Sequence, residues 1–223
     1  MLYFQKFFVL FLSLSILGCS NNREEIVRKG FDRYKGQYLL YVDKGNFFMS
    51  IYNRDLKSVV DYKIGYGLNP DRKPKLYSGD KRTPEGLYSI IEILSMDAAK
   101  NTTTYKKLKM MNKVYFRAKE GHSKYGKLNV DLGTDAYGPR FFRIDYPNES
   151  DISRYEKAKK GGNLPLKNGK LPGIGSGIGI HGNNDEASIG HLCSSGCIRM
   201  YNNDIVELDK YIQIGTPVII SNK

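Results

Sequence analysis

Short runs of hydrophobic residues, bounded by polar and turn-forming residues, recur along the chain from residue 37 onward. Their length and their aromatic and β-branched residues predict β-strands. The residues at 43–46, Asp-Lys-Gly-Asn, separate the first two runs and predict a turn between antiparallel strands. We therefore expect an antiparallel, strand-rich core. The predicted strands span residues 38–42, 47–52, 58–64, 87–91, 141–145 and 216–220.

Helical patterns occupy less of the chain. Residues 98–111 fit either a short helix or an irregular loop. Residues 161–177 contain six glycines and predict a loop, because glycine weakens both helices and strands. Two segments combine a helical pattern with polar residues suited to capping. The predicted helices are residues 152–160, with Asp151 as cap, and residues 204–212, with Asn202 or Asn203 as cap and Gly215 as the stop.

The amino-terminal residues have the pattern of a secretion signal. The apolar run from Phe7 to Leu17 is shorter than the roughly 20 residues of a membrane-spanning helix, but it suits the core of a signal peptide. Ile16-Leu17-Gly18-Cys19 resembles a bacterial lipobox, which is cut before the cysteine that then receives a lipid. An ordinary signal peptide with an incidental cysteine is the alternative. The predicted organisation is a lipoprotein signal peptide at 1–18, a lipidated tether at 19–36 and one domain at 37–221.

Length and charge narrow the class of protein. A chain of 223 residues supports one substantial core. The formal net charge of +12 favours an anionic partner such as nucleic acid, anionic lipid or a cell-wall polymer. The lysines are scattered, and neither an RNA-binding aromatic signature nor zinc-finger spacing is present, so no nucleic-acid partner is expected.

The segment IHGNNDEASIGHLCSSGCIRM, residues 180–200, holds two of the three histidines and two of the three cysteines. A cysteine is nucleophilic as its thiolate, and an ordinary pKa near 8.5 leaves only a few per cent ionised at neutral pH. A histidine within hydrogen-bond reach changes this by forming a thiolate–imidazolium pair. We predict that Cys197 is the nucleophile and His181 its base.

Alternation also predicts which way these side chains point. If residues 178–181 are extended, His181 faces away from the core beside Gly179, whose bare backbone leaves room for a substrate. After the Ser-Ser-Gly turn, Cys197 and Arg199 share one face. The amides around Gly196 and Cys197 are expected to bind an oxyanion, and losing one such donor costs about 3 kcal/mol. The predicted core-facing residues are Ile178, Ile180, Ile198 and Met200.

Other histidines and cysteines have plainer interpretations. Cys193 is expected to be a small buried hydrophobic residue, because the glycine and serines before Cys197 disfavour the helix that would pair the two thiols. We expect His122 in a surface loop and His191 in solvent. A zinc site formed by His181, His191, Cys193 and Cys197 is an alternative that common zinc spacings do not support.

The residues around the cysteine resemble those of YkuD-type L,D-transpeptidases of bacterial cell walls. The resemblance rests on Ile180-His181-Gly182, on the sixteen residues from His181 to Cys197 and on Ser194-Ser195-Gly196-Cys197-Ile198-Arg199-Met200. Thr83-Pro84-Glu85-Gly86 before a strand resembles another recurrent segment of the family. The similarity covers residues 37–221, and with the signal it identifies a lipoprotein member. It implies a mostly β fold, a β-sandwich of two mixed sheets with a few peripheral helices.

The resemblance also implies acyl transfer without a cofactor or metal. Cys197 would attack the carbonyl before the terminal D-Ala of a peptidoglycan stem tetrapeptide and release that D-Ala. An amine of a neighbouring stem peptide or of a wall-anchored protein would then take the acyl group. His181 would be the base. The further site residues implied are Gly182, Ser195 and Gly196 for orientation or the oxyanion, and Arg199 and Ser194 for substrate binding.

The sequence departs from the usual family pattern in ways that leave alternatives open. Ser195 stands where a histidine is usual, and the stretch from Pro84 to His181 is long enough to predict a lid or an altered groove. The segment at 145–148 resembles a divergent branch that includes hydrolases, so water can replace the acceptor amine. The alternatives are therefore an amidase of the same acyl-enzyme type and a non-catalytic wall-binding lipoprotein. We expect the protein in the cell envelope, lipid-anchored and facing the periplasm, with the outer membrane as one destination.

Overall fold

The computed structural model describes residues 14–32 and 34–222, with side chains from residue 23 onward. Most of the predicted signal peptide, residues 1–13, lies outside this range. Cys19 is described only by its backbone, which belongs to a helix, so the predicted lipidation stays a prediction.

Eight strands form one mixed sheet in the order β11-β9-β8-β5-β12-β1-β2-β3. β1 pairs with β12, and β9 with β11, in parallel, while the other neighbours are antiparallel. Their bounds are β1 Tyr38–Asp43, β2 Phe48–Asn53, β3 Ser58–Lys63, β5 Gly86–Ser95, β8 Arg140–Ile144, β9 Gly179–His181, β11 Ile198–Arg199 and β12 Pro217–Ser221. Two short pairs accompany them: β4 Tyr66–Gly67 with β10 Leu192–Ser194, and β6 Ser123–Lys124 with β7 Lys127–Asp131.

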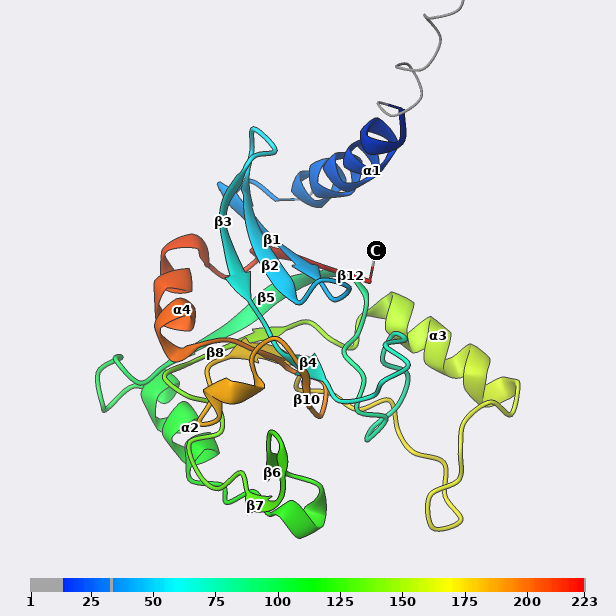
Figure 1. The fold of residues 1–223 in the computed structure, drawn as a ribbon, viewed down its shortest axis with the longest axis vertical. Helices are drawn as coiled ribbons and strands as arrows, with labels where there is room; N and C mark the ends of the chain where they lie inside the picture. Colours follow the sequence, from blue (N-terminus) through cyan, green and yellow to red (C-terminus); the bar gives the residue numbers. More distant parts are fainter. Residues whose placement is uncertain (1–13, 33, 223) are drawn as a thin grey trace, which may run out of the picture.

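β5 joins the two halves of this sheet. Residues 86–89 of β5 pair with β12, whereas residues 90–95 pair with β8, and the register shifts between Ile90 and Glu92. Such an irregularity bends a strand, so the sheet curls and its two halves enclose one core (Figure 1). The mostly β prediction is confirmed, and the layers expected of a sandwich are the halves of one curled sheet. The core includes Leu40, Met49, Ile51, Ile90, Phe142, Ile180, Ile198 and Val218.

Four α-helices surround the sheet in the described part of the chain. They are α1 Leu14–Phe31, α2 Thr103–Asn112, α3 Glu149–Lys160 and α4 Asn202–Glu207, with 3-10 turns η1 Ala118–Glu120, η2 Glu186–Ser188 and η3 Leu208–Tyr211. The ambiguous segment at 98–111 thus forms a helix, α2, whose cap is Thr102.

Two predicted caps differ from the structure. Asn148 caps α3, and Asp151 is the third helical residue, whose carboxylate returns a bond to the Asn148 amide in a capping box. The carboxy-terminal helix follows Tyr201, which makes no side-chain cap bond, and Asn202 is already helical. Asn202 is instead used in a side-chain contact described below. A polar residue near a helix start is therefore an ambiguous signal when tertiary contacts compete for it.

The segment expected to be a tether is largely the helix α1, which lies against β1 and β12 (Figure 1). Val27 and Phe31, four residues apart, are buried and pack against Leu39, Tyr41 and Ile219. Arg23 forms an ion pair of 2.7 Å with Asp43. The sequence interpretation weighed the charged residues of this segment and missed its narrow apolar stripe. Across the described residues, no helix is both long and apolar enough to traverse a bilayer.

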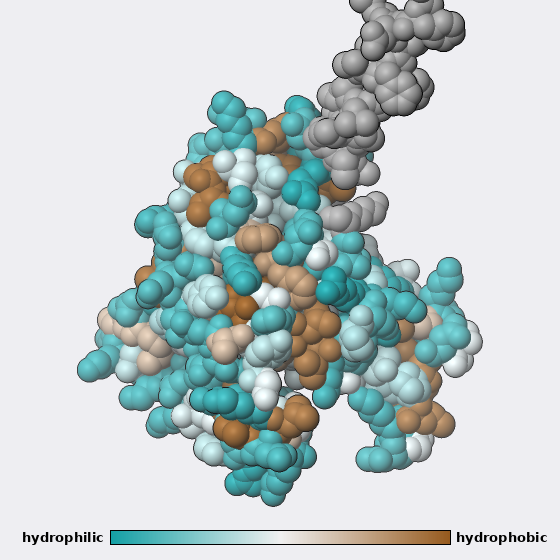
Figure 2. Space-filling model, viewed as in Figure 1, coloured by the Kyte–Doolittle hydropathy of each residue, from teal (hydrophilic) through white to brown (hydrophobic). Residues whose placement is uncertain are grey.

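The long stretch between Pro84 and His181 contributes β5, α2 and a lobe formed by η1 and the β6–β7 hairpin. In Figure 1 this lobe lies at the end of the molecule opposite α1. Hydrophilic residues cover much of the face in Figure 2, and hydrophobic patches reach the surface near the centre and on this lobe. Leu128, at the hairpin, has 81% of its surface exposed.

The packing of α1 predicts a measurable contribution to stability. Phe31→Ala should lower the free energy of unfolding by about 3 kcal/mol, because a large buried ring is replaced by a cavity. Chemical denaturation of the full chain measures this. Arg28→Ala, on the exposed side of the same helix, serves as the control and should change stability by less than about 0.5 kcal/mol. Equal stability of the two variants would show that α1 does not contribute to the folded core.

Candidate active site

The pairing of two short parallel strands places the predicted nucleophile and base. In the register of β9 and β11, Ile180 lies opposite Ile198, and His181 opposite Arg199. Because side chains alternate along a strand, Cys197, two residues before Arg199, faces the same side as Arg199 and His181. The predicted core-facing residues Ile178, Ile180, Ile198 and Met200 are all buried in the main core.

His181 is held rigidly and is 3% exposed. Its Nδ1 lies 2.5 Å from the carbonyl oxygen of Gly182. An Nδ1–H donating to this oxygen leaves the lone pair on Nε2. The imidazole stacks on Phe141 at a centroid distance of 5.6 Å, and Tyr137 packs at 5.1 Å. Burial, with a smaller effect of the Arg199 charge, lowers the pKa of His181 to about 3.

Cys197 packs against the apolar cluster whose aromatic member, Phe141, also carries the His181 ring. Tyr137 packs against the same cluster. The thiol is partly buried, and its Sγ lies 3.7 Å from the carbonyl oxygen of Gly177. Burial raises the pKa of Cys197, while contact with the Gly179 backbone and the positive charges of Arg199 and Lys75 lower it.

The resting state differs from the expected ion pair. The pKa directions make both the Cys197 thiol and the His181 imidazole neutral at pH 7. Within residues 14–32 and 34–222, no hydrogen bond joins the two side chains. The structure therefore brings the predicted base and the predicted nucleophile to one apolar cluster as an uncharged pair, because burial disfavours both charged forms.

The turn before Cys197 is closed by Ser194. Its hydroxyl accepts from the Gly196 amide at 3.1 Å and donates to the Cys197 carbonyl oxygen at 2.5 Å. The Ser194 hydroxyl therefore makes both of its hydrogen bonds within the turn, although Ser194 also borders the cavity described below. With the Gly196 amide engaged, the Cys197 amide is the remaining one of the two expected oxyanion donors. Ser195 is exposed at the cavity edge.

Gly196 is required by its surroundings. Its φ of +143° is rarely adopted by other residues. A Cβ at this position would also lie 2.8 Å from the carbonyl oxygen of Arg82. On the other side of the turn, the Thr83 hydroxyl donates to the Gly196 carbonyl oxygen at 2.8 Å and accepts from the Gly67 amide at 2.9 Å. Thr83, the first residue of Thr83-Pro84-Glu85-Gly86, thus ties the nucleophile turn to β4.

A cavity of about 220 Å³ lies beside this turn, between it and the β6–β7 hairpin. Arg199 lines the cavity, is 8% exposed and has a buried Nε that lacks a hydrogen-bond partner in the described part of the chain. The hairpin is fastened by Tyr125, whose amide donates to Asp185 at 2.7 Å and whose ring stacks on His191 at 4.2 Å. The hairpin therefore covers a pocket that presents a buried guanidinium.

The remaining histidines and cysteines are only partly as expected. His122 lies in the loop between η1 and β6, as predicted, but it is partly buried, packs on Phe116 at 5.0 Å and lines the cavity. Burial, followed by the charge of Lys81, lowers the pKa of His122. His191 is exposed, as predicted, but its ring is covered by Tyr125.

Cys193 is a free thiol, as is Cys197. It lies at the cavity and contacts Ser188 and Arg199, and burial raises its pKa. Among the residues that the structure describes, no group of three or more histidine, cysteine, aspartate and glutamate side chains could hold a metal ion.

Sequence reasoning missed two asparagines that fix the segment after His181. Asn183 donates through Nδ2 to the Met200 carbonyl oxygen at 2.9 Å. Asn202 accepts from the Asn183 amide at 2.9 Å and donates to its carbonyl oxygen at 2.8 Å. The aromatic wall of Tyr137 and Phe141 was also missed. The only signal for Asn202 was its position before a helical pattern, which suggested a cap instead.

Comparisons with known proteins identify the family of the chain. The profile of the YkuD family, described as the L,D-transpeptidase catalytic domain, matches residues 37–220. Two Bacillus subtilis proteins named as L,D-transpeptidases match locally. YqjB is 50% identical over 44 residues, 20% of this chain and 25% of that protein, and YkuD is 54% identical over 43 residues, 19% and 26% respectively. The matched segment thus spans about a quarter of each curated relative.

The fold is shared with a solved structure. The helical cell shape determining protein Pgp2 of Campylobacter jejuni is 19% identical with a TM-score of 0.51, over 85% of this chain and 48% of that chain. Bd1075 of Bdellovibrio bacteriovorus is 22% identical with a TM-score of 0.49, over 84% and 48%. This chain therefore covers about half the length of these structures. The family profile spans the whole folded domain, including both strands of the site, and the chain belongs to the YkuD family of L,D-transpeptidase catalytic domains.

Proposed function

We propose that this protein is a cysteine-dependent L,D-transpeptidase that cross-links or modifies peptidoglycan stem peptides through a thioester. The observation that carries the proposal is the placement of His181 and Cys197 on one face of paired strands, beside the apolar cluster that contains Phe141. The match of residues 37–220 to the family supports it.

The proposed acylation uses the free Nε2 of His181. This nitrogen takes the Cys197 proton as Sγ bonds to the carbonyl carbon before the terminal D-Ala. The carbonyl oxygen becomes an oxyanion, for which the Cys197 amide is the proposed donor. When the carbon–nitrogen bond breaks, the leaving amine takes the proton from His181, and D-Ala departs. An acceptor amine then attacks the thioester, and its proton passes through His181 back to sulfur.

Substrate binding has to assist the proton transfer. In the resting state, burial raises the pKa of Cys197 and lowers that of His181 to about 3. Each pKa unit that separates donor from acceptor adds about 1.4 kcal/mol to the cost of transfer. The attraction between the new thiolate and imidazolium offsets this cost only when the two groups are close. We therefore place ionisation after substrate binding, concerted with attack.

Arg199 is the proposed contact for a substrate carboxylate. A guanidinium that is 8% exposed and has a partnerless Nε suits a planar anion. Its place in the cavity under the β6–β7 hairpin would position such a group within reach of the turn that carries Cys197. The acceptor amine is proposed to come from a neighbouring stem peptide or a wall-anchored protein.

Lipidation of Cys19 is proposed to hold the enzyme at a membrane, facing the periplasm. The lipobox-like Ile16-Leu17-Gly18-Cys19 supports this location. Because α1 packs on the sheet through Val27 and Phe31, the anchor would lie only about two helical turns from the folded domain. The enzyme would therefore act on wall polymer close to its membrane.

Incubation of the full chain with a disaccharide tetrapeptide tests the reaction. Transpeptidation should give a cross-linked dimer and free D-Ala, detected by mass spectrometry. Tripeptide with free D-Ala and no dimer would indicate the hydrolase instead, and unchanged substrate from the folded protein would favour a binding protein.

Matched cysteine variants test the assignment of the nucleophile. Cys197→Ala should abolish product because the thioester cannot form, whereas Cys193→Ala should retain most of the activity. His181→Ala should lower the rate by about 10²-fold or more, as expected for a general base. An active Cys197→Ala variant beside an inactive Cys193→Ala variant would reverse the assignment.

A carbapenem should acylate Cys197. Attack on its strained lactam carbonyl forms the thioester and opens the ring, and the ring nitrogen gains the proton, so the protein gains the whole mass of the drug. Fragment mass spectrometry should locate this mass on Cys197. Attachment to Cys193, or no attachment to the folded protein, would contradict the proposed site.

Replacing Cys19 tests the anchor. In a bacterial host that processes lipoproteins, the protein with Cys19 in place should sediment with membranes. Cys19→Ser should move the protein to the soluble periplasmic fraction. Ser20→Ala, next to the site, is the control and should stay with the membranes. Membrane association that survives Cys19→Ser would show that the cysteine is not the anchor.

A further inference from the structure

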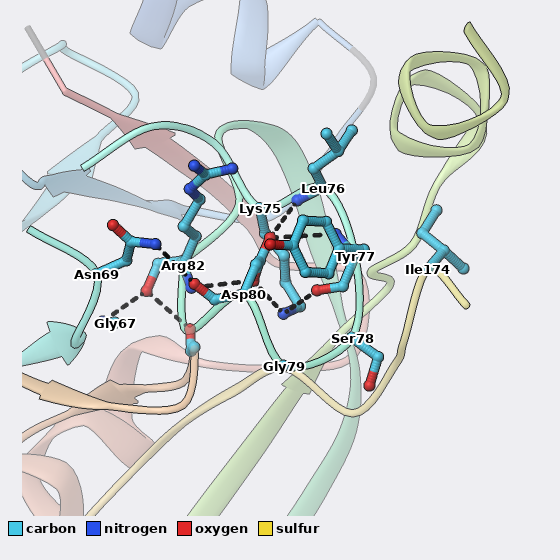
Figure 3. A network of polar contacts seen from close by, with 12 residues as sticks. Gly67, Asn69, Lys75, Leu76, Tyr77, Ser78, Gly79, Asp80, Arg82 and Ile174 are labelled. Atoms are coloured by element: carbon cyan, nitrogen blue, oxygen red, sulfur yellow. Dashed lines mark hydrogen bonds and ion pairs between the residues drawn. The ribbon is translucent and has the colours of Figure 1, made fainter. Parts of the chain in front are cut away.

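The loop between β4 and β5 contains a buried ion pair that neither the sequence motifs nor the proposed chemistry uses. Lys75 and Asp80 lie 2.8 Å apart, with side-chain exposures of 4% and 0%. Figure 3 shows this pair at the centre of a polar network. Burying two charges is costly unless their geometry and hydrogen bonds compensate. The energetic cost of burying such a pair in an irregular loop suggests that the pair has a structural or functional role.

Asp80 organises the loop around itself. Its carboxylate accepts from the backbone amides of Leu76 at 2.6 Å, Tyr77 at 3.1 Å and Arg82 at 3.0 Å, as well as from Lys75 (Figure 3). Lys75 also donates to the Tyr77 carbonyl oxygen at 3.1 Å. These bonds close residues 75–82 into a compact turn with a fixed backbone.

This turn supports Cys197 from two sides. On one side, Thr83 follows it directly and holds the Gly196 carbonyl oxygen at 2.8 Å. On the other side, the Ser78 amide donates to the carbonyl oxygen of Gly173 at 2.7 Å, at the start of the segment whose Gly177 carbonyl contacts the Cys197 thiol. The loop thus bridges the nucleophile turn and the glycine-rich segment opposite it.

The charge of Lys75 also lowers the pKa of Cys197, although by less than the Gly179 backbone and Arg199 do. In the described part of the chain, the titratable or charged side chains near Cys197 include Arg199 on β11, Tyr137 before β8 and Lys75 on the loop, and His181 lies on the same face of the paired strands. Burial raises the pKa of Cys197, and the cations Arg199 and Lys75 oppose this effect. Lys75 comes from the loop between β4 and β5, outside the strands β9 and β11 that position the proposed base and nucleophile.

We propose that Lys75, fixed by Asp80, is a positioning residue for Cys197: it holds the loop that clamps the nucleophile turn and provides a positive charge that stabilises the thiolate. The assignment rests on Cys197 being the nucleophile of the proposed function. A second buried lysine provides a control that distinguishes support of the loop from the effect of the positive charge. Lys44, 0% exposed, braces the same loop through the Arg72 and Thr83 carbonyl oxygens and Glu85, at 2.9, 3.3 and 2.7 Å.

The rate of Cys197 alkylation by iodoacetamide against pH tests the proposal in the full chain, with fragment mass spectrometry distinguishing Cys197 from Cys193. Lys75→Gln keeps a donor for Asp80 but removes the charge. It should raise the midpoint of the profile by about half a unit to one unit, so that alkylation at pH 7 slows about three- to tenfold. Lys75→Arg should leave the midpoint close to that of the protein without a substitution, because the positive charge is retained.

The matched control is Lys44→Gln, which should lower the thermal unfolding temperature without moving the midpoint. Lys75→Met replaces the glutamine variant should that variant not fold. An unchanged midpoint in folded Lys75→Gln or Lys75→Met, or an equal shift in Lys44→Gln, overturns the proposal. Alkylation needs no peptidoglycan substrate. An inactive enzyme with the expected shift therefore contradicts the proposed function alone, whereas an active enzyme without the shift contradicts only the role of Lys75.

Discussion

The parallel pairing of β9 with β11 determines where the reactive side chains lie. These strands contribute only three and two residues, yet their register sets His181 beside Arg199 and puts Cys197 on the same face. Two residues cannot define a strand by their own propensity. The position of β11 is maintained by its buried neighbours Ile198 and Met200 and by the bridge from Arg199 to Gly65, with bonds of 2.7 and 2.9 Å. The site therefore depends on core packing and on a backbone contact from another part of the sheet.

The sequence pattern predicted the features that depend on neighbouring residues along the chain, namely the strand positions and the faces of their side chains. The alternation around Cys197 and His181 gave the faces of Ile178 and Ile198 because the period of two follows from strand geometry alone. Strands β1, β2, β3, β5, β8 and β12 lie where the short hydrophobic runs of the sequence lie. The family resemblance supplied the remainder of the expected architecture, which periodicity alone does not specify.

The missed features all rest on contacts between distant residues. Phe31 is part of a core only because Ile219, nearly two hundred residues later, is placed beside it. Tyr137 faces His181 only after β8 has paired with β9. The charge state of His181 also depends on residues far away in the sequence. Burial beside Phe141 keeps the resting imidazole neutral, and the sequence spacing between His181 and Cys197 cannot reveal this.

Catalytic chemistry and fold stability meet in the loop before β5. The half of the sheet with β8, β9 and β11 carries the thiol and the imidazole, whereas the loop with Lys75 and Thr83 leaves β4 and enters β5. β5 is shared by both halves, so a change in curl at its register shift would move Thr83 relative to Gly196. Burial makes each ionic group around the site costly, yet the same low polarity strengthens the attraction between a thiolate and the cations beside it. In the proposed reaction, a site that is neutral at rest beside the fixed cations Arg199 and Lys75 would ionise only when a substrate completes the enclosure, and the curled sheet would keep those charges in place until then.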